Sequence, residues 1–147
     1  MKTFESQLIS IAESTQSLCA QAEAVNFIGT GWTPAIILGH IVDVNEEVWM
    51  ARFTMMRDAL HNGQEPPQLN SWEPDGEKTA EKYATSSVAD SIALLRKSRN
   101  EMSIFLQSLS VADRSASALH KTFGTITIES MLQIILNHDE EHRASID

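Results

Sequence analysis

The residues with the most evident chemistry in this chain are His138 and His142, which lie four positions apart. On a helix this spacing puts two side chains on one face, with Cβ atoms roughly 5–6 Å apart, so their imidazoles could share a metal ion. Apolar residues recur at Ile128, Met131 and Ile135, and the same spacing continues onto the two histidines. Unpaired buried polar groups are costly, so a metal, or else side chains and water around structural histidines, must satisfy these rings.

A third histidine, His40, lies between Ile37 and Val44 at the edge of the apolar face of an earlier predicted helix. His40, His138 and His142 together predict a divalent-metal site. Three histidines with one open position are typical of catalytic zinc sites, whereas structural sites fill all four positions with protein ligands. Zinc or nickel suits these ligands best and iron is also compatible.

The segment His138–His142 differs from the H-E-x-x-H motif of metalloproteases. That motif places a glutamate directly after the first histidine as the general base. Here the position is Asp139, whose side chain is shorter, so the sequence does not indicate a protease. No carboxylate can be selected as a general base, and the catalytic residues stay unknown.

Length and composition fit one soluble domain over residues 1–147, with 42% hydrophobic residues. The net charge of −9 argues against nucleic acid or an anionic membrane as the main partner. The single cysteine, Cys19, excludes a disulfide within the chain and a Cys-ligated zinc site. Because no signal sequence or membrane-spanning run is visible, we expect a cytoplasmic protein.

Four segments show helical periodicity, and none shows sustained strand alternation. They cover about 4–25, 34–62 and 88–109, and a fourth stretch that opens within 125–127 and runs to about 146. The second begins with Thr33 as N-cap and Pro34 at the first helical position. A further short helix is expected around 77–83. The sequence therefore predicts an all-α, four-helix bundle.

The histidines constrain the topology of this bundle. His40 lies near the start of the second helix and His142 near the end of the fourth, so they meet only if these helices are antiparallel. That requires an up-down-down-up order, with a long crossover between the second and third helices. The crossover must span about 40 Å at about 1.5 Å per helical residue. The 25 residues of 62–86 reach roughly 80 Å when extended, which is ample.

Several other side chains allow two interpretations. Asp43 could orient an imidazole or, like its neighbours Glu46 and Glu47, face solvent. Arg99 falls on the apolar face of the third helix, where an ion pair is the simpler explanation and an anchor for an anionic ligand the alternative.

The aromatic residues Trp49 and Trp72 could line a pocket or act as packing anchors. His61 and His120 lie near the ends of helices or loops and are expected to be exposed. Cys19 is interpreted as a small packing residue, with no feature that would depress its thiol pKa.

The chain resembles the DinB/YfiT-like family of four-helix bundles. The likeness rests on 32–34, 39–43 and Trp49, and on 123–127 and 138–143. The family pattern is one histidine on the second helix and an H-x-x-x-H pair on the fourth, which bind a divalent metal. It falls on His40, His138 and His142 with no ligand missing.

The resemblance also implies a homodimer and, in some members, thiol-dependent transferase or isomerase chemistry with mycothiol, bacillithiol or glutathione. The leading hypothesis is a metal-dependent enzyme that activates such a low-molecular-weight thiol against a small electrophilic substrate. Metal-assisted hydrolysis is the alternative reaction. A third possibility, of another class, is a non-catalytic metal-binding or small-ligand-binding dimeric bundle.

Overall fold

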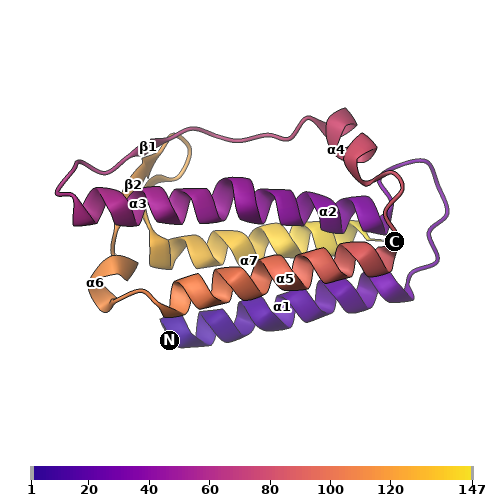
Figure 1. Cartoon of the computed structure of the whole chain (residues 1–147), viewed down its shortest axis with the longest axis horizontal. Helices are drawn as coiled ribbons and strands as arrows, with labels where there is room; N and C mark the ends of the chain where they lie inside the picture. The colour runs from indigo at the N-terminus through magenta and orange to yellow at the C-terminus, as the bar shows by residue number, and fades with distance from the viewer. Residues whose placement is uncertain (1, 147) are drawn as a thin grey trace.

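The computed structural model describes residues 2–146 as four long helical rods packed side by side, with a small sheet at one end (Figure 1). The elements are α1 (Phe4–Ala24), α2 (Pro34–Val44), the π-helical turn η1 (Asn45–Met50), α3 (Ala51–His61), β1 (Gln68–Leu69), α4 (Gly76–Tyr83), α5 (Val88–Gln107), α6 (Val111–Arg114), β2 (Ser117–His120), β3 (Gly124–Thr127) and α7 (Ile128–Ser145). Between residues 2 and 146, no helix combines the length and the apolar composition that crossing a bilayer requires.

The helices begin where the sequence places their caps. The predicted N-cap of α2 is confirmed, since the side chain of Thr33 accepts a hydrogen bond from the backbone N–H of Ile36, with Pro34 as the first helical residue. Reciprocal capping boxes start α1, α5 and α7 at Thr3, Ser87 and Thr127. The predicted short helix also forms, as α4.

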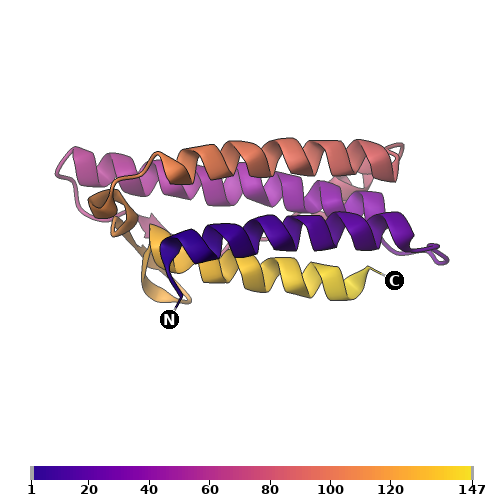
Figure 2. The same ribbon diagram turned by 90° about the horizontal axis from the view of Figure 1, so that it is seen from below.

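The directions of the helices follow from pairs of contacts. Ser91 near the start of α5 donates to the carbonyl of Ala35 near the start of α2. Ser98, farther along α5, accepts from Asn45, the first residue after α2. Contacts that advance together on both helices mean that the helices run the same way. In Figure 1 the segment between α3 and α5 accordingly returns along the outside of the bundle through β1 and α4, and Figure 2 shows the four rods from below.

The π turn η1 changes which residues of the second helical rod are buried. The sequence predicts a buried face that continues from Val48 to Ala51 and Met55, but both of these side chains are exposed. The core instead receives Phe53 and Met56. A π turn takes up about one more residue than an α turn, so the inward face moves on by one position. Ordinary helical periodicity could not anticipate this shift.

The prediction of an all-helical chain is wrong at one end of the bundle. Strands β2 and β3 form an antiparallel pair, and the two residues of β1 pair with β2 in parallel. Residues 125–127, within which the fourth helix was expected to open, belong to β3, and α7 begins at Ile128. These strands are too short to show a period of two in the sequence.

Two apolar clusters fill the core, and polar residues separate them. One lies toward the sheet and contains Phe53, Met102 and Ile128, and the other lies toward the start of α2 and contains Leu18 and Leu38. Between them are the buried polar side chains of Thr15, Asn45, Ser98, Arg99 and Asp139. Of the three histidines of interest, His40 lies on α2, and His138 and His142 lie on α7.

Helix α4 docks on α2 through a glycine. A Cβ on Gly39 would lie 2.5 Å from ring atoms of Tyr83, whose hydroxyl donates to Asp43. We expect Gly39→Ala to lower the free energy of unfolding by about 1–3 kcal/mol, as overpacking does, although alanine is the better helix former.

Urea unfolding of Gly39→Ala and of the control Gly31→Ala would measure this. A Cβ on Gly31 has no atom within 4 Å among the described residues, so that variant should lose no stability through packing. If Gly39→Ala were as stable as the wild type, the close packing of α4 on α2 would be wrong.

Candidate metal centre

The structure brings His40, His138 and His142 together at one place between α2 and α7. The Nε2 atom of His142 lies 3.1 Å from Nε2 of His40 and 3.2 Å from Nε2 of His138. One nitrogen from each ring lies within 4.8 Å of the other two, and these three residues form a group that could hold a metal ion. The candidate site therefore combines one histidine from the first half of the chain with two from the last helix.

The chemistry of the three rings fits a metal better than it fits hydrogen bonding. An imidazole nitrogen has one in-plane position, which holds either a proton or a lone pair. Nε2 of His142 can therefore make one good hydrogen bond, yet two other Nε2 atoms approach it. Three nitrogens bound to one ion at about 2.0–2.1 Å lie roughly 2.8–3.4 Å apart, and the two Nε2–Nε2 separations of His142 fall within this range.

Aromatic rings surround the histidines. The ring centroid of His40 lies 5.2 Å from that of Trp32 and 6.3 Å from that of Trp72, and His138 lies 5.8 Å from Trp49. Nδ1 of His40 and Nδ1 of His138 are buried without a hydrogen-bond partner among residues 2–146. The rings are thus oriented by packing, not by a carboxylate.

Burial keeps these imidazoles neutral. It lowers the pKa of His40 to about 4, with a further contribution from the nearby His142 and an opposing one from Asp43. It also lowers the pKa of His138 to about 4, assisted by the two other histidines. The pKa of His142 is lowered for the same reason. Metal ligation requires neutral imidazole, so the cluster is in the state that binds metal at pH 7.

These shifts predict acid lability of the metal-free protein. The pKa values of His40 and His138 are about 4 when folded and about 6.5 when unfolded, so the unfolded chain binds more protons between these values. Their contribution to stability is complete above pH 6.5 and is lost as the pH falls toward 4. In chelator, the melting temperature of the wild type should fall more steeply over this range than that of a His40→Gln/His138→Gln variant. Parallel pH profiles would contradict the prediction.

The structure settles the roles of Asp43 and Arg99, for each of which the sequence left two interpretations open. Asp43 neither orients an imidazole nor faces solvent, since it accepts hydrogen bonds from Lys82 (2.8 Å) and Tyr83 (2.6 Å) of α4. This contact raises the pKa of Lys82, and burial together with the same contact raises the pKa of Tyr83 to about 12. Arg99 makes the expected ion pair, donating to both oxygens of Asp139.

Among the remaining residues, one expectation is wrong. His61 is exposed as predicted, but His120 is buried, because the hairpin β2–β3 folds it inward beneath Phe123. Cys19 is a buried packing residue, and burial raises the pKa of its thiol.

A cavity of about 400 Å³ opens beside the histidines. Its lining consists of Val44, Val48, Trp49, Arg52, Ser71, Trp72, His120, Thr122, Phe123, Ile134, Asn137, His138 and Glu141. Both tryptophans therefore line a pocket, and Trp49 is at the same time buried in the core. A second cavity of about 400 Å³ reaches His142 from the side of Trp32. Small molecules could thus approach the cluster from two directions.

Sequence reasoning missed Arg52, His120 and Glu141 as cavity residues. Arg52 and His120 line the same cavity because the small sheet brings its strands close to α3, and this sheet was not predicted. Glu141 could have been found, because on a helix it lies three residues after His138 and so beside it.

Comparison with known proteins agrees with the four-helix bundle described above. A model of the DinB superfamily matches residues 11–146. No curated protein matches the chain in sequence. Among solved structures, YfiT from Bacillus subtilis, described as a probable metal-dependent hydrolase with an unusual four-helix bundle topology, superposes with a TM-score of 0.75 at 20% identity, over 97% of this chain and 83% of YfiT.

A second solved structure is the mycothiol-dependent maleylpyruvate isomerase, with a TM-score of 0.67 at 16% identity. The match covers 99% of this chain and 63% of the isomerase, so this chain spans less than two thirds of that protein. At these identities the likenesses establish the fold, which is that of the YfiT four-helix bundle.

Proposed function

Because this chain belongs to the DinB superfamily and its three imidazoles converge, we propose that His40, His138 and His142 bind one divalent metal ion in a metal-dependent enzyme. The observation that carries the proposal is the approach of three Nε2 atoms that cannot satisfy one another by hydrogen bonds. Zinc or nickel suits the ligands best, and iron is compatible.

We also propose a role for the order and direction of the helices. His40 lies in the early part of the rod formed by α2, η1 and α3, and it meets His142 near the end of α7. We infer that the up-down-down-up order, with its long crossover, serves to bring His40 to the histidine pair. YfiT, which is described as having an unusual bundle topology, supports this reading.

A bound divalent ion would supply Lewis acidity and lower the pKa of a thiol or water at its open position. The chain's own residues provide the surroundings. Trp72 lies beside His40 and Trp49 beside His138, so apolar surface flanks the imidazoles on this side. Glu141 places a carboxylate on the wall that also carries His138. The cavity volume suits a small organic substrate and not a polymer.

Of the possible reactions, we favour transfer of a low-molecular-weight thiol to a small electrophile, or isomerisation assisted by such a thiol. The likeness to a mycothiol-dependent isomerase and the two cavities that reach the cluster support a reaction with two small molecules. Metal-dependent hydrolysis is the second candidate, and the description of YfiT supports it. A non-catalytic metal-binding bundle is the third. We expect a cytoplasmic homodimer in each case.

One experiment separates these classes. The metal-loaded protein and the protein in chelator are each offered small electrophiles and esters, with and without a thiol, and turnover is measured. Turnover that needs both metal and thiol supports the transferase, and turnover that needs metal alone supports the hydrolase. A metal-loaded protein that turns over neither class would refute the proposed enzymatic function in favour of a binding protein.

A further inference from the structure

The cavity beside His138 contains a cation without a counter-ion. Arg52, in the first turn of α3, is half-buried, and burial lowers the pKa of its guanidinium. One of its nitrogens donates to the carbonyl of Asn70 at 2.7 Å, but Arg52 makes no ion pair with any residue from 2 to 146. In contrast, Arg99 is buried with both terminal nitrogens on Asp139. Arg52 keeps part of its guanidinium accessible, so it can bind an anionic ligand without first giving up an ion pair.

The neighbouring His120 is fixed as a hydrogen-bond donor. Two backbone N–H groups, of Thr122 (3.0 Å) and Phe123 (3.2 Å), share the single lone pair of its Nδ1, so this nitrogen accepts and carries no proton. The neutral ring must therefore carry its proton on Nε2, and within residues 2–146 this atom has no hydrogen-bond partner. His120 is buried and lines the cavity, so its free N–H donor is available to a ligand there.

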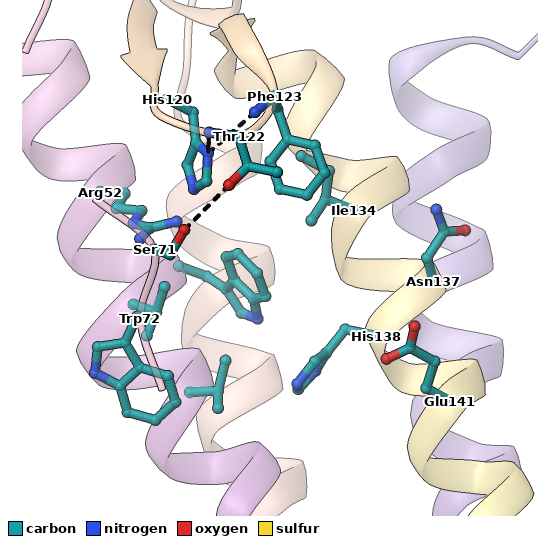
Figure 3. Close-up of a pocket in the computed structure, with 13 residues that line it drawn as sticks. Arg52, Ser71, Trp72, His120, Thr122, Phe123, Ile134, Asn137, His138 and Glu141 are labelled. Carbon is teal, nitrogen blue, oxygen red and sulfur yellow. Dashed lines mark hydrogen bonds between the residues drawn. The ribbon is translucent and has the colours of Figure 1, made fainter. Parts of the chain in front are cut away.

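These groups gather at one end of the cavity. Figure 3 shows Arg52, Ser71, His120 and Thr122 together at the sheet end, and His138 at the other end. The hydroxyls of Ser71 and Thr122 lie 3.1 Å apart and tie the segment after β1 to the turn after β2. Glu141 lies near His138 and would repel an anion from that end. The cavity is thus positive at one end and acidic at the other, with aromatic walls between.

We propose that Arg52 and His120 form a carboxylate-binding subsite, and that the substrate is a small organic carboxylate with an apolar body. The guanidinium supplies charge and paired donors, and the imidazole adds a fixed donor, as carboxylate recognition requires. Held there, such a molecule has its body against Trp49 and Trp72 and its far end directed to His138. Only this last step rests on the proposed function; the binding of the carboxylate does not need a metal.

The test uses the full chain in chelator, so that no metal can bind the probe. We expect 3-phenylpropanoate to bind saturably in an NMR titration and to shift the resonances of His120 and Arg52. The uncharged analogue 3-phenylpropanamide should bind at least tenfold more weakly, and Arg52→Gln should weaken binding of the carboxylate at least tenfold. Arg57→Gln is the matched control, since Arg57 lies on the same helix and pairs with Asp58 at the surface, and should bind as the wild type does.

Equal binding of acid and amide by the wild type, or by Arg52→Gln and the wild type, would overturn the proposal. The wild-type comparison decides the matter even if the variant is unstable. Nitrogen chemical shifts offer a second check, because His120 should be neutral with its proton on Nε2, and a proton on Nδ1 would also overturn it. Loss of the metal site would leave these results unchanged, so the two proposals can fail independently.

Discussion

Replacing Asp139 by asparagine is expected to lower the free energy of unfolding by about 3–5 kcal/mol, a large part of the total for a domain of this size. Asp139 is fully buried and accepts two hydrogen bonds from Arg99, at 2.7 and 2.8 Å, and a third from Ser14. The variant leaves the guanidinium of Arg99 buried without its counter-charge. Urea unfolding monitored by circular dichroism would measure the loss.

Two further variants test whether the loss of stability arises from the burial of the Arg99–Asp139 pair. Glu140→Gln removes the adjacent carboxylate, which pairs with Arg143 at the surface, and should leave the urea midpoint nearly unchanged. Replacing both partners, as Arg99→Met with Asp139→Leu, should restore much of the stability, because a matched apolar pair carries no unpaired charge. A loss of less than about 1 kcal/mol in Asp139→Asn would mean that the pair is solvated.

The second large effect is expected on metal binding. His142→Ala removes the imidazole that lies nearest to both others, so the variant should lose most of its affinity for divalent metal. In the wild type, metal at a hundredfold excess over its dissociation constant should add about 2.7 kcal/mol to the free energy of unfolding. For a domain of this size, each kcal/mol of added stability raises the melting temperature by roughly 2–4 °C. The variant should show little of this rise.

Comparison with chelator isolates the role of the ligand. Without metal, His142→Ala and the wild type should have similar stability, because the imidazoles of the metal-free site lack good partners. His61→Ala removes an exposed histidine of α3 and should respond to metal as the wild type does. If His142→Ala and the wild type gained equally from metal, the binding site would lie elsewhere.

The long helices were predictable because each has a periodic apolar face and a cap at its start. Thr33 with Pro34 located the start of α2 from the sequence alone. The register of the second half of that rod was not predictable, because η1 inserts one residue and turns Met55 outward and Phe53 inward. The sheet was missed because a two-residue strand such as β1 gains its stability from its neighbours and not from its own sequence.

For the site, spacing and topology led to the three histidines, since two of them share one helix and the third could reach them in one arrangement only. The contacts made by folding could not be inferred in the same way. Asp43 binds α4, which belongs to the crossover, and His120 is buried by the hairpin β2–β3. The sequence does not show where either segment packs. Arg52 gave no signal, since an arginine on a helix is ordinarily solvated.

Anomalous diffraction from crystals of the metal-loaded protein tests the central claim most directly. Data collected on either side of the absorption edge of the bound metal locate the ion without reference to the protein chain. We predict one peak per chain, about 2.0–2.2 Å from the Nε2 atoms of His40, His138 and His142. A peak bound by other residues, or no peak among these three imidazoles at saturating metal, would contradict the account.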